Sequence, residues 1–341
     1  MSESLRITLV GAGMIEIPPP GYGAVEKHIW NLARALEERG HTVRIVNRVF
    51  GRASSAEYRF ALWARKEVAR EPWDALHVHT PGVAAVFRAM GPRRFVYTTH
   101  SRHWATTKGL GEKIGFALEK RAVAKAAAVI AVSRFVAQQI DRPTRVIPNG
   151  VDVARYAPDP ARRFGKSILG IGEIAEHKKW LVAAMAAREL DVQLRIAGPI
   201  RDPAYADAIE KASGGKTTLL GALSEEELLR ELAAADVLVH PSVSESFGMA
   251  VVEGMGAALP VVCSDMLSFL VENGKEGWLI PTKGEDAKRA EILREKVALL
   301  LADPQARIAM GRRAREKAVA GYSWESIAAQ VEGVYREVAA R

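Results

Sequence analysis

The sequence predicts an α/β protein built from two doubly wound domains that face a common cleft. The length of 341 residues, of which 48 % are hydrophobic, is sufficient for two domains with separate cores. Short apolar segments alternate with amphipathic helical segments, which favours parallel sheets covered by helices on both faces. A single interruption rich in proline and glycine falls near the middle. Ligands of such sheets bind beyond the carboxyl ends of the strands, so we expect both domains to direct that edge at the cleft.

The first half of the chain begins with a short apolar strand and a loop rich in proline and glycine. A helix is predicted over 26–39, because its apolar residues recur on one face, and Gly40 ends it. Further apolar runs predict strands that alternate with helical stretches. The strands of this half are expected at 5–10, 41–46, 75–79, 95–100, 128–132 and 145–147.

The interruption lies at 148–160, where Pro148 and Asn149 are followed by Pro158 and Pro160, and we interpret it as the linker. The second half then repeats the α/β pattern and closes with helices from about residue 288 onward. Its strands are expected at 167–171, 193–197, 218–220, 237–240, 260–263 and 277–280. This organisation predicts domains at 1–155 and 156–320, followed by a C-terminal helical segment at 321–341.

The composition excludes several classes of protein. The apolar fraction is too high for a disordered chain, and no stretch approaches the ~20 uninterrupted apolar residues of a membrane-spanning helix. The first apolar run is too short and too early for a signal peptide. Cys263 is the single cysteine, so no intrachain disulfide can form, which favours a reducing compartment. We therefore expect a cytoplasmic protein.

Positive charge is concentrated in the first half of the chain. Residues 1–163 carry 26 lysines and arginines against 14 acidic residues, whereas the remainder carries 22 against 26. The asymmetry suggests an anionic partner for the first half, although drift in surface composition would give the same counts. The segment 108–125 combines basic and apolar residues, so it is either a contact with an anionic membrane surface or a packed helix with a basic edge.

Two familiar nucleotide-binding motifs are incomplete in this chain. Gly11 and Gly13 begin a dinucleotide-binding fingerprint, but Glu16 stands where the third glycine belongs. The segment 215–217 has the composition of the end of a phosphate-binding loop, yet a strand rather than a helix is expected after it. Neither motif predicts a site.

Metal ligation is not predicted either. His77 and His79 lie two apart on a strand, and therefore on one face, but no third and fourth ligand stands at a suitable spacing. We interpret them as packed at a strand end. Cys263 lies in an apolar strand and is expected to be an inert buried thiol. No Asp-x-Asp triplet occurs in the chain, which favours phosphate handling without a metal.

The segment 240–262 carries the strongest chemical signal. A strand ends at its start, a loop carries Glu245, and a helix is expected over about 247–258. The first turn of a helix offers free N–H groups and a dipole that favours an anion. Gly248 lets a ligand approach the backbone closely. The segment therefore predicts an anion-binding helix end.

Two carboxylates flank this helix end. Glu253 lies about a turn and a half inside the helix and can face the same side as Glu245. Carboxylates suit the diol groups of a sugar and the helix end suits a phosphate, so the set matches the shape of a nucleoside-diphosphate sugar. The alternative is structural: Glu245 would cap the helix, and Glu253 would lie on its solvated face.

The same segment resembles the E-x7-E signature of retaining glycosyltransferases of family 4, which have the GT-B fold. The resemblance implies two Rossmann-like domains, an acceptor-binding one at 1–155 and a nucleotide-sugar-binding one at 156–320. The helix around Trp324 resembles the one that crosses back and packs on the first domain. The likeness covers nearly the whole chain, and it includes the segments 21–26, 74–79, 96–100, 131–133, 148–152 and 234–242.

The resemblance also implies roles for individual residues. Glu245 would contact the donor sugar hydroxyls and support positive charge at the anomeric carbon, and Glu253 would hold the nucleotide ribose. Lys178 would neutralise the leaving diphosphate, and His100 would lie where sugar and acceptor meet. Further contacts with the donor are implied for Gly23 and for the amides of Phe247, Gly248 and Met249, and contacts with the acceptor for Tyr22, Glu26, Arg102 and His103.

The activity implied is transfer of a sugar from a UDP- or GDP-sugar to an acceptor hydroxyl, with retention of configuration and without a metal or other cofactor. The acceptor would be a small molecule, a glycan or a lipid-linked molecule, and an anionic one would suit the basic first half. A cytoplasmic enzyme with peripheral contact to the inner face of the membrane is compatible with that charge.

One position departs from the family pattern. Lys178 stands where the family has its lysine, but Glu173 replaces the arginine five residues before it. An acid beside a diphosphate is electrostatically unfavourable. Either another cation such as Lys179 or Arg201 substitutes, or the donor is held differently.

Two other functions are compatible with parts of this pattern. A sugar-nucleotide epimerase of the same fold would share the motifs. A basic nucleic-acid-binding protein would explain the net charge of +8, but aromatic residues are not interleaved with basic runs and no nucleic-acid-binding motif is present, so no nucleic-acid partner is expected.

Overall fold

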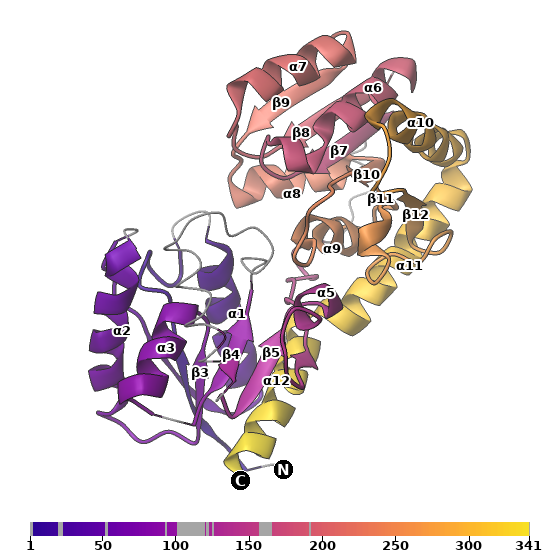
Figure 1. Cartoon of the computed structure of the whole chain (residues 1–341). Coiled ribbons are helices and arrows are strands. Elements are labelled where there is room, and N and C mark those ends of the chain that lie inside the picture. The colour runs from indigo at the N-terminus through magenta and orange to yellow at the C-terminus, as the bar shows by residue number, and fades with distance from the viewer. Residues whose placement is uncertain are drawn as a thin grey trace. The chain divides into compact units, whose positions relative to one another are not determined.

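A computed structural model of the chain divides into two compact units (Figure 1). The first unit comprises residues 1–150 and 324–341, and the second comprises residues 151–323. Each unit contains a six-stranded parallel sheet with helices packed against it. The structure describes residues 3–19, 23–51, 54–92, 94–100, 120, 123–124, 126–156, 166–190 and 192–340.

The sheet of the first unit has the strand order β2-β1-β3-β4-β5-β6. The strands are β1 (Arg6–Val10), β2 (Thr42–Val46), β3 (Ala75–Val78), β4 (Val96–Thr99), β5 (Ala128–Ala131) and β6 (Arg145–Val146). The chain places β2 on one side of β1 and all later strands on the other, so the strand order reverses between β1 and β3. The helices described in this unit are α1 (Ala24–Glu38), α2 (Ser54–Val68), α3 (Pro81–Met90), α5 (Arg134–Ala137) and α12 (Trp324–Ala339).

The core of the first unit is shared by its sheet, α1 and the C-terminal helix α12. Ile29, Leu32 and Leu36 of α1 are fully buried, as are Ile327 and Tyr335 of α12. All five belong to one hydrophobic cluster that also contains strand residues. The helix that ends the chain therefore completes the core of the unit that begins it, as the resemblance implies.

A cluster of charged side chains fixes α12 beside the end of α1. Glu332 of α12 accepts hydrogen bonds from Arg39, at 2.8 Å, and from Arg336, also at 2.8 Å. Burial on its own would raise the pKa of Glu332, but the hydrogen bonds from Arg336, Arg39 and His41 lower it from 4.5 to about 2. The cluster stabilises the fold only while Glu332 is ionised.

The sheet of the second unit has the order β12-β11-β10-β7-β8-β9, again parallel throughout. Its strands are β7 (Ser167–Ile171), β8 (Gln193–Ala197), β9 (Thr217–Gly221), β10 (Val237–His240), β11 (Val261–Ser264) and β12 (Gly277–Ile280). The helices are η2 (Glu176–Lys178), α6 (Trp180–Leu190), α7 (Pro203–Ser213), α8 (Glu225–Ala234), α9 (Met249–Gly256), η3 (Asp265–Leu267), α10 (Asp286–Ala302) and α11 (Pro304–Tyr322), where η marks a 3₁₀ turn.

The expected elements correspond to observed ones, with shifts at their ends. The most informative shift concerns α9, which begins at Met249 rather than near Phe247. Gly248 has a φ of 98°, in the left-handed region, so the helix cannot extend back through it. Within the described ranges, no helix is both long enough and apolar enough to cross a membrane.

We expect Glu332→Gln to lower the free energy of unfolding at pH 7 by roughly 1.5–3 kcal/mol, the range for hydrogen bonds to charged groups. Because the pKa is depressed in the folded state, the stabilisation is complete above about pH 4.5 and is lost as the pH falls towards about 2. The difference between wild type and variant should therefore shrink over that interval, which urea denaturation at a series of pH values measures.

The matched control is Glu337→Gln on the same helix. The Arg145–Glu337 pair is half-exposed, so its loss should cost less than about 1 kcal/mol. Equal losses in the two variants, or a Glu332 effect that persists unchanged at pH 2, would contradict the assignment.

Candidate functional site

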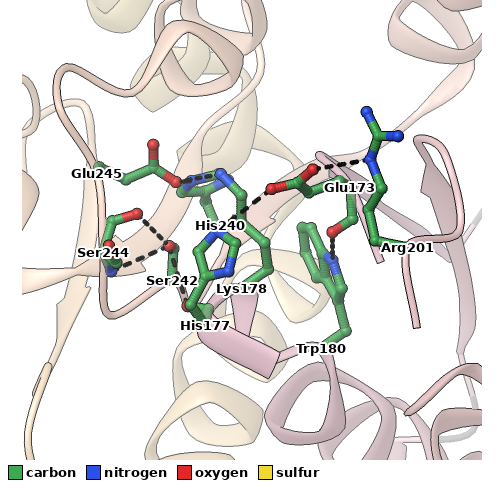
Figure 2. Close-up of polar contacts among 9 residues, drawn as sticks. All are labelled: Glu173, His177, Lys178, Trp180, Arg201, His240, Ser242, Ser244 and Glu245. Atoms are coloured by element: carbon green, nitrogen blue, oxygen red, sulfur yellow. Dashed lines mark hydrogen bonds and ion pairs between the residues drawn. The ribbon is translucent and has the colours of Figure 1, made fainter. Parts of the chain in front are cut away.

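Polar side chains gather at the carboxyl ends of β7 and β10 in the second unit. These two strands pair at the centre of the sheet, where the strand order reverses. Such a switch point is where α/β sheets bind ligands. Lys178 comes from the turn η2 after β7, His240 is the last residue of β10, and Glu245 lies in the loop after β10 (Figure 2).

One carboxylate oxygen joins these three side chains. Glu245 Oε1 lies 2.6 Å from Lys178 Nζ and 2.7 Å from His240 Nε2. Both ion-pair partners are largely buried, with 14 % of the Lys178 side chain and 11 % of the Glu245 side chain exposed. Burial alone would raise the pKa of Glu245, but His240 and Lys178 hold it well below its usual range. Glu245 is therefore ionised at neutral pH.

The turn that carries Lys178 is fastened to the loop that carries Glu245. The carbonyl oxygen of His177 accepts a hydrogen bond from the amide of Val243 at 2.9 Å and one from the Ser242 hydroxyl at 3.3 Å. These backbone contacts set the spacing between the two loops. These hydrogen bonds and the Lys178–Glu245 ion pair therefore hold the two loops together.

Glu173, the acid at the position of the family arginine, has two basic neighbours, Arg201 and His177. Its carboxylate lies 3.2 Å from Arg201 Nε and 3.6 Å from His177 Nε2 (Figure 2). Lys179 instead pairs with Asp286 at 3.1 Å. Of the two substitute cations considered from the sequence, Arg201 is thus the one beside Glu173, and the acid does not stand as an unbalanced charge.

The loop after β10 leads into α9, whose N-cap is Gly248. Phe247 is buried against the rings of Phe269 and Tyr322, at centroid distances of 6.2 and 5.9 Å. This packing holds the backbone of residues 247–249 at the start of the helix, where the first N–H groups have no partner within the helix. The side chain of Phe247 is therefore structural, and its backbone is what a ligand would meet.

Glu253 lies within α9 and approaches a different group from Glu245. The Tyr156 hydroxyl is 3.5 Å from Glu253 Oε1, and burial together with this carboxylate raises the pKa of Tyr156. Lys178 and Glu245 are thus in direct contact, whereas Glu253 lies beside Tyr156. The two carboxylates of the signature have distinct surroundings.

The other predicted site residues lie in the first unit or outside the described residues. Gly23 precedes α1, where a methyl group on it would come within 2.5 Å of Ile15, and Glu26 is buried in the first turn. His100 follows β4, and burial lowers its pKa to about 4. Tyr22, Arg102 and His103 lie outside the described residues, as does most of the basic segment 108–125.

Two residues of the second unit do not stand out in the sequence. His240 could have been found, because the last residue of a strand in a parallel sheet lies at the ligand-binding edge. Arg289 gives no such signal. It lies on α10 among other charged residues, yet it is 1 % exposed.

Arg289 connects the carboxyl ends of three neighbouring strands. Its guanidinium donates to the carbonyl oxygens of Pro241, at 2.6 Å, and Pro281, at 2.8 Å, which follow β10 and β12. It also approaches the hydroxyl of Ser264, the last residue of β11, at 3.4 Å. One buried cation therefore holds the loop that carries Glu245 against the neighbouring loop.

Two family models match the chain. The model of Glycosyltransferase Family 4 matches residues 23–155, and that of Glycosyl transferases group 1 matches residues 165–303.

Curated proteins are similar over most of the chain. A phosphatidyl-myo-inositol mannosyltransferase of Mycolicibacterium smegmatis is 28 % identical, over 98 % of this chain and 94 % of its own length. An alpha-maltose-1-phosphate synthase of Mycobacterium tuberculosis is 31 % identical, over 72 % of this chain and 73 % of its own length.

Solved structures share the fold at lower identity. Sucrose-phosphate synthase from Thermosynechococcus elongatus superposes with a TM-score of 0.81 at 20 % identity, covering 98 % of this chain and 99 % of its own. Anabaena HepE, in a complex with UDP-glucose, gives 0.76 at 19 % identity and covers 98 % and 100 %. Both likenesses confirm the predicted GT-B arrangement of sheets and helices.

We expect Arg289→Met to destabilise the second unit. Each buried carbonyl left without its donor costs about 1–3 kcal/mol, so the loss in unfolding free energy should be on the order of 3 kcal/mol. Denaturant unfolding measures it. Lys288→Met on the same helix is the control, because Lys288 and its partner Glu291 are exposed and water screens their ion pair. A similar, small effect in both variants would show that Arg289 does not hold the strand ends.

Proposed function

The chain belongs to the glycosyl transferases group 1, and from this we propose that it is a retaining enzyme that moves a sugar from a nucleoside-diphosphate sugar to an acceptor hydroxyl. The observation that carries the proposal is the Glu245 carboxylate shared by Lys178 and His240 at the switch point of the second sheet. It combines a cation for a leaving phosphate with a fixed negative charge for an electron-poor sugar carbon.

Lys178 would act on the leaving group. An ammonium has three N–H donors, and the contact with Glu245 uses one, so others remain for oxygens of a diphosphate. Arg201 would supply the second positive charge that the family arginine supplies elsewhere. These groups neutralise the diphosphate without a divalent metal there, in keeping with the lack of an Asp-x-Asp triplet.

Glu245 would act on the sugar. Its fixed charge favours a transition state in which positive charge develops at the anomeric carbon. Its two hydrogen-bonded partners and its depressed pKa make it a weak nucleophile, which disfavours a covalent intermediate and supports reaction on one face of the sugar. The amides of Phe247, Gly248 and Met249 would meet the sugar and diphosphate, and Glu253 would hold the ribose.

The acceptor would bind the first unit. His100, neutral at pH 7 because burial lowers its pKa, would accept a hydrogen bond from a sugar or acceptor hydroxyl. As the resemblance implies, Tyr22, Glu26, Arg102 and His103 would contact the acceptor, whereas Gly23 would contact the donor. An anionic lipid acceptor suits the basic first half, and the mannosyltransferase relative is named for a phosphatidyl-inositol acceptor. We therefore propose a cytoplasmic enzyme with peripheral contact to the membrane.

The direct test is to incubate the enzyme with a panel of UDP- and GDP-sugars and with lipid and glycan acceptors. The expected product keeps the anomeric configuration of the donor, as read by NMR, and forms equally well with EDTA present. An inverted product, or no transfer from any nucleotide sugar, would overturn the proposal. Free epimerised sugar nucleotide would indicate the epimerase alternative.

Lys178→Ala should lower kcat by about 10²-fold or more, the usual loss for one donor to a developing oxyanion. Lys179→Ala is the adjacent comparison, because its ammonium is bonded to Asp286, and its effect should be far smaller. Turnover assays with a confirmed donor measure both. If the two variants lose activity equally, Lys178 has no special role at the leaving group.

The Glu245→Gln and Glu253→Gln variants should change different kinetic constants. Glu245→Gln removes an interaction that strengthens in the transition state, so kcat should fall heavily with a modest change in donor KM. Glu253→Gln weakens ground and transition states alike, so it should mainly raise donor KM and weaken nucleoside-diphosphate binding by roughly 1–3 kcal/mol. Calorimetry with the nucleoside diphosphate distinguishes them. Loss of nucleotide affinity in Glu245→Gln alone would reverse the two assignments.

A further inference from the structure

The imidazole of His240 contacts the Glu245 carboxylate from the end of a central strand (Figure 2). His240 is the last residue of β10, which pairs with β7 on one side and with β11 on the other. Its register partner on β11 is Cys263, and its side chain is 1 % exposed. The backbone of His240 is therefore held by the sheet, and its ring is shielded from solvent.

The ring of His240 is also fixed by packing. It lies edge-to-face with the ring of Trp180, at a centroid distance of 6.1 Å and an interplanar angle of 84°. Trp180 is fully buried, and its indole donates a hydrogen bond to the carbonyl oxygen of Glu173 at 3.0 Å. Lys178, by contrast, reaches Glu245 through a flexible four-carbon stem. Of the two partners of Glu245, His240 is therefore the rigid one.

His240 makes one polar contact, and that contact is with Glu245. Because Glu245 is ionised and can only accept, His240 Nε2 carries the proton of this hydrogen bond. Among the residues that the structure describes, the buried Nδ1 has no hydrogen-bond partner. A buried polar atom without a partner is costly, and an apolar side chain would fill the same space without that cost. Packing alone therefore does not account for a histidine at this position.

The two partners of Glu245 bind the same oxygen. Lys178 Nζ and His240 Nε2 both contact Oε1, at 2.6 and 2.7 Å. Within the part of the chain that the structure describes, Oε2 has no such contact, and Figure 2 shows it pointing away from both partners. The carboxylate is thus held by one oxygen and has the other available for a ligand.

We propose that His240 is a positioning residue that keeps Glu245 directed at the donor sugar while Lys178 turns to the leaving diphosphate. This inference rests on the proposed function. As the bond to the diphosphate breaks, negative charge on the leaving group draws the Lys178 ammonium, and positive charge develops at the anomeric carbon. The hold of Lys178 on Glu245 weakens in the step that needs the carboxylate in place. His240 keeps its proton, holds Oε1 and leaves Oε2 for the sugar.

The first test replaces the imidazole by an apolar side chain. His240→Met should lower kcat by about 10- to 100-fold, the range for loss of one hydrogen bond to a charged group. The donor KM and the Kd of the nucleoside diphosphate should change by less than about twofold, because Lys178 still fixes Glu245 in the ground state. Turnover assays and calorimetry measure these constants. An unchanged kcat, or a loss confined to donor KM, would overturn the assignment.

Two conservative variants separate the donor atom from the volume of the ring. The amide of Gln reaches the place of the Nε2–H group, so His240→Gln should recover kcat to within about tenfold of the wild type. The shorter Asn places its amide nearer to Nδ1, so His240→Asn should be as slow as His240→Met. Equal kcat values for the Gln and Asn variants would show that a hydrogen bond from the Nε2 position is not what matters.

Cys263→Ala is the matched control for damage to the sheet. Cys263 is fully buried and pairs with His240, but it does not contact Glu245. The variant should lower Tm while leaving kcat unchanged, whereas the His240 variants should lower kcat out of proportion to Tm. If kcat falls in step with Tm in every variant, the role of His240 is structural and the proposal fails.

A measurement without turnover keeps the inference distinct from the proposed function. Nitrogen-15 correlation spectra of the wild type, with the His240 ring assigned by its loss in His240→Gln, locate the ring protons. A proton on Nε2 at neutral pH is expected, and a proton on Nδ1 alone would overturn the contact with Glu245. If the wild type transfers no sugar, the proposed function fails. Transfer at equal rates in the wild type and in His240→Met would overturn the role of His240 alone.

Discussion

The carboxylate of Glu245, shared by Lys178 and His240, is the contact on which the arrangement of the second unit's ligand-binding edge depends. Lys178 and Glu245 are 67 residues apart and lie in a three-residue turn and a loop, so neither is fixed by a long regular element. Removing one partner of a largely buried pair costs about 3–5 kcal/mol, because the other charge is left unpaired. Replacing both by apolar residues would cost little. The pair therefore constrains the loops without being needed for stability, which fits a role in chemistry.

The two sheets share a reversal of strand order, but they carry different side chains at that place. In each, the strand order reverses between adjacent parallel strands, β1 and β3 in one and β7 and β10 in the other. The carboxyl ends of those strands then present side chains that the chain cannot bury against a crossover helix. The second unit places an ion pair there, and the first places three neutral imidazoles. Among the described residues, the second unit thus has a cluster of charged side chains at this edge and the first has a cluster of imidazoles.

The elements of this fold are predictable because buried parallel strands read as short apolar runs. The position of Glu245 follows for the same reason, since a loop after a central strand lies at the ligand-binding edge. The partners of such residues are not predictable. Arg289 is buried because Pro241, Ser264 and Pro281 surround its guanidinium. The sequence of its own helix gives no sign of these partners, which lie on distant segments. The start of α9 is missed because it depends on the backbone angle of Gly248.

An acid at position 173 is compatible with a nearby diphosphate because its ion-pair partner, Arg201, is exposed. The Arg201 side chain is 59 % exposed and that of Glu173 is 36 % exposed, whereas Lys178 and Glu245 are largely buried. An exposed pair contributes about 0–1 kcal/mol, so Arg201 can leave Glu173 at little cost. An incoming diphosphate would therefore recruit Arg201 first, while the buried Lys178–Glu245 pair keeps its geometry. Without a ligand, Glu173 holds Arg201 in place and the two pairs carry no net charge. Under the proposed function, Glu173 would thereby keep a cation, Arg201, close to the diphosphate.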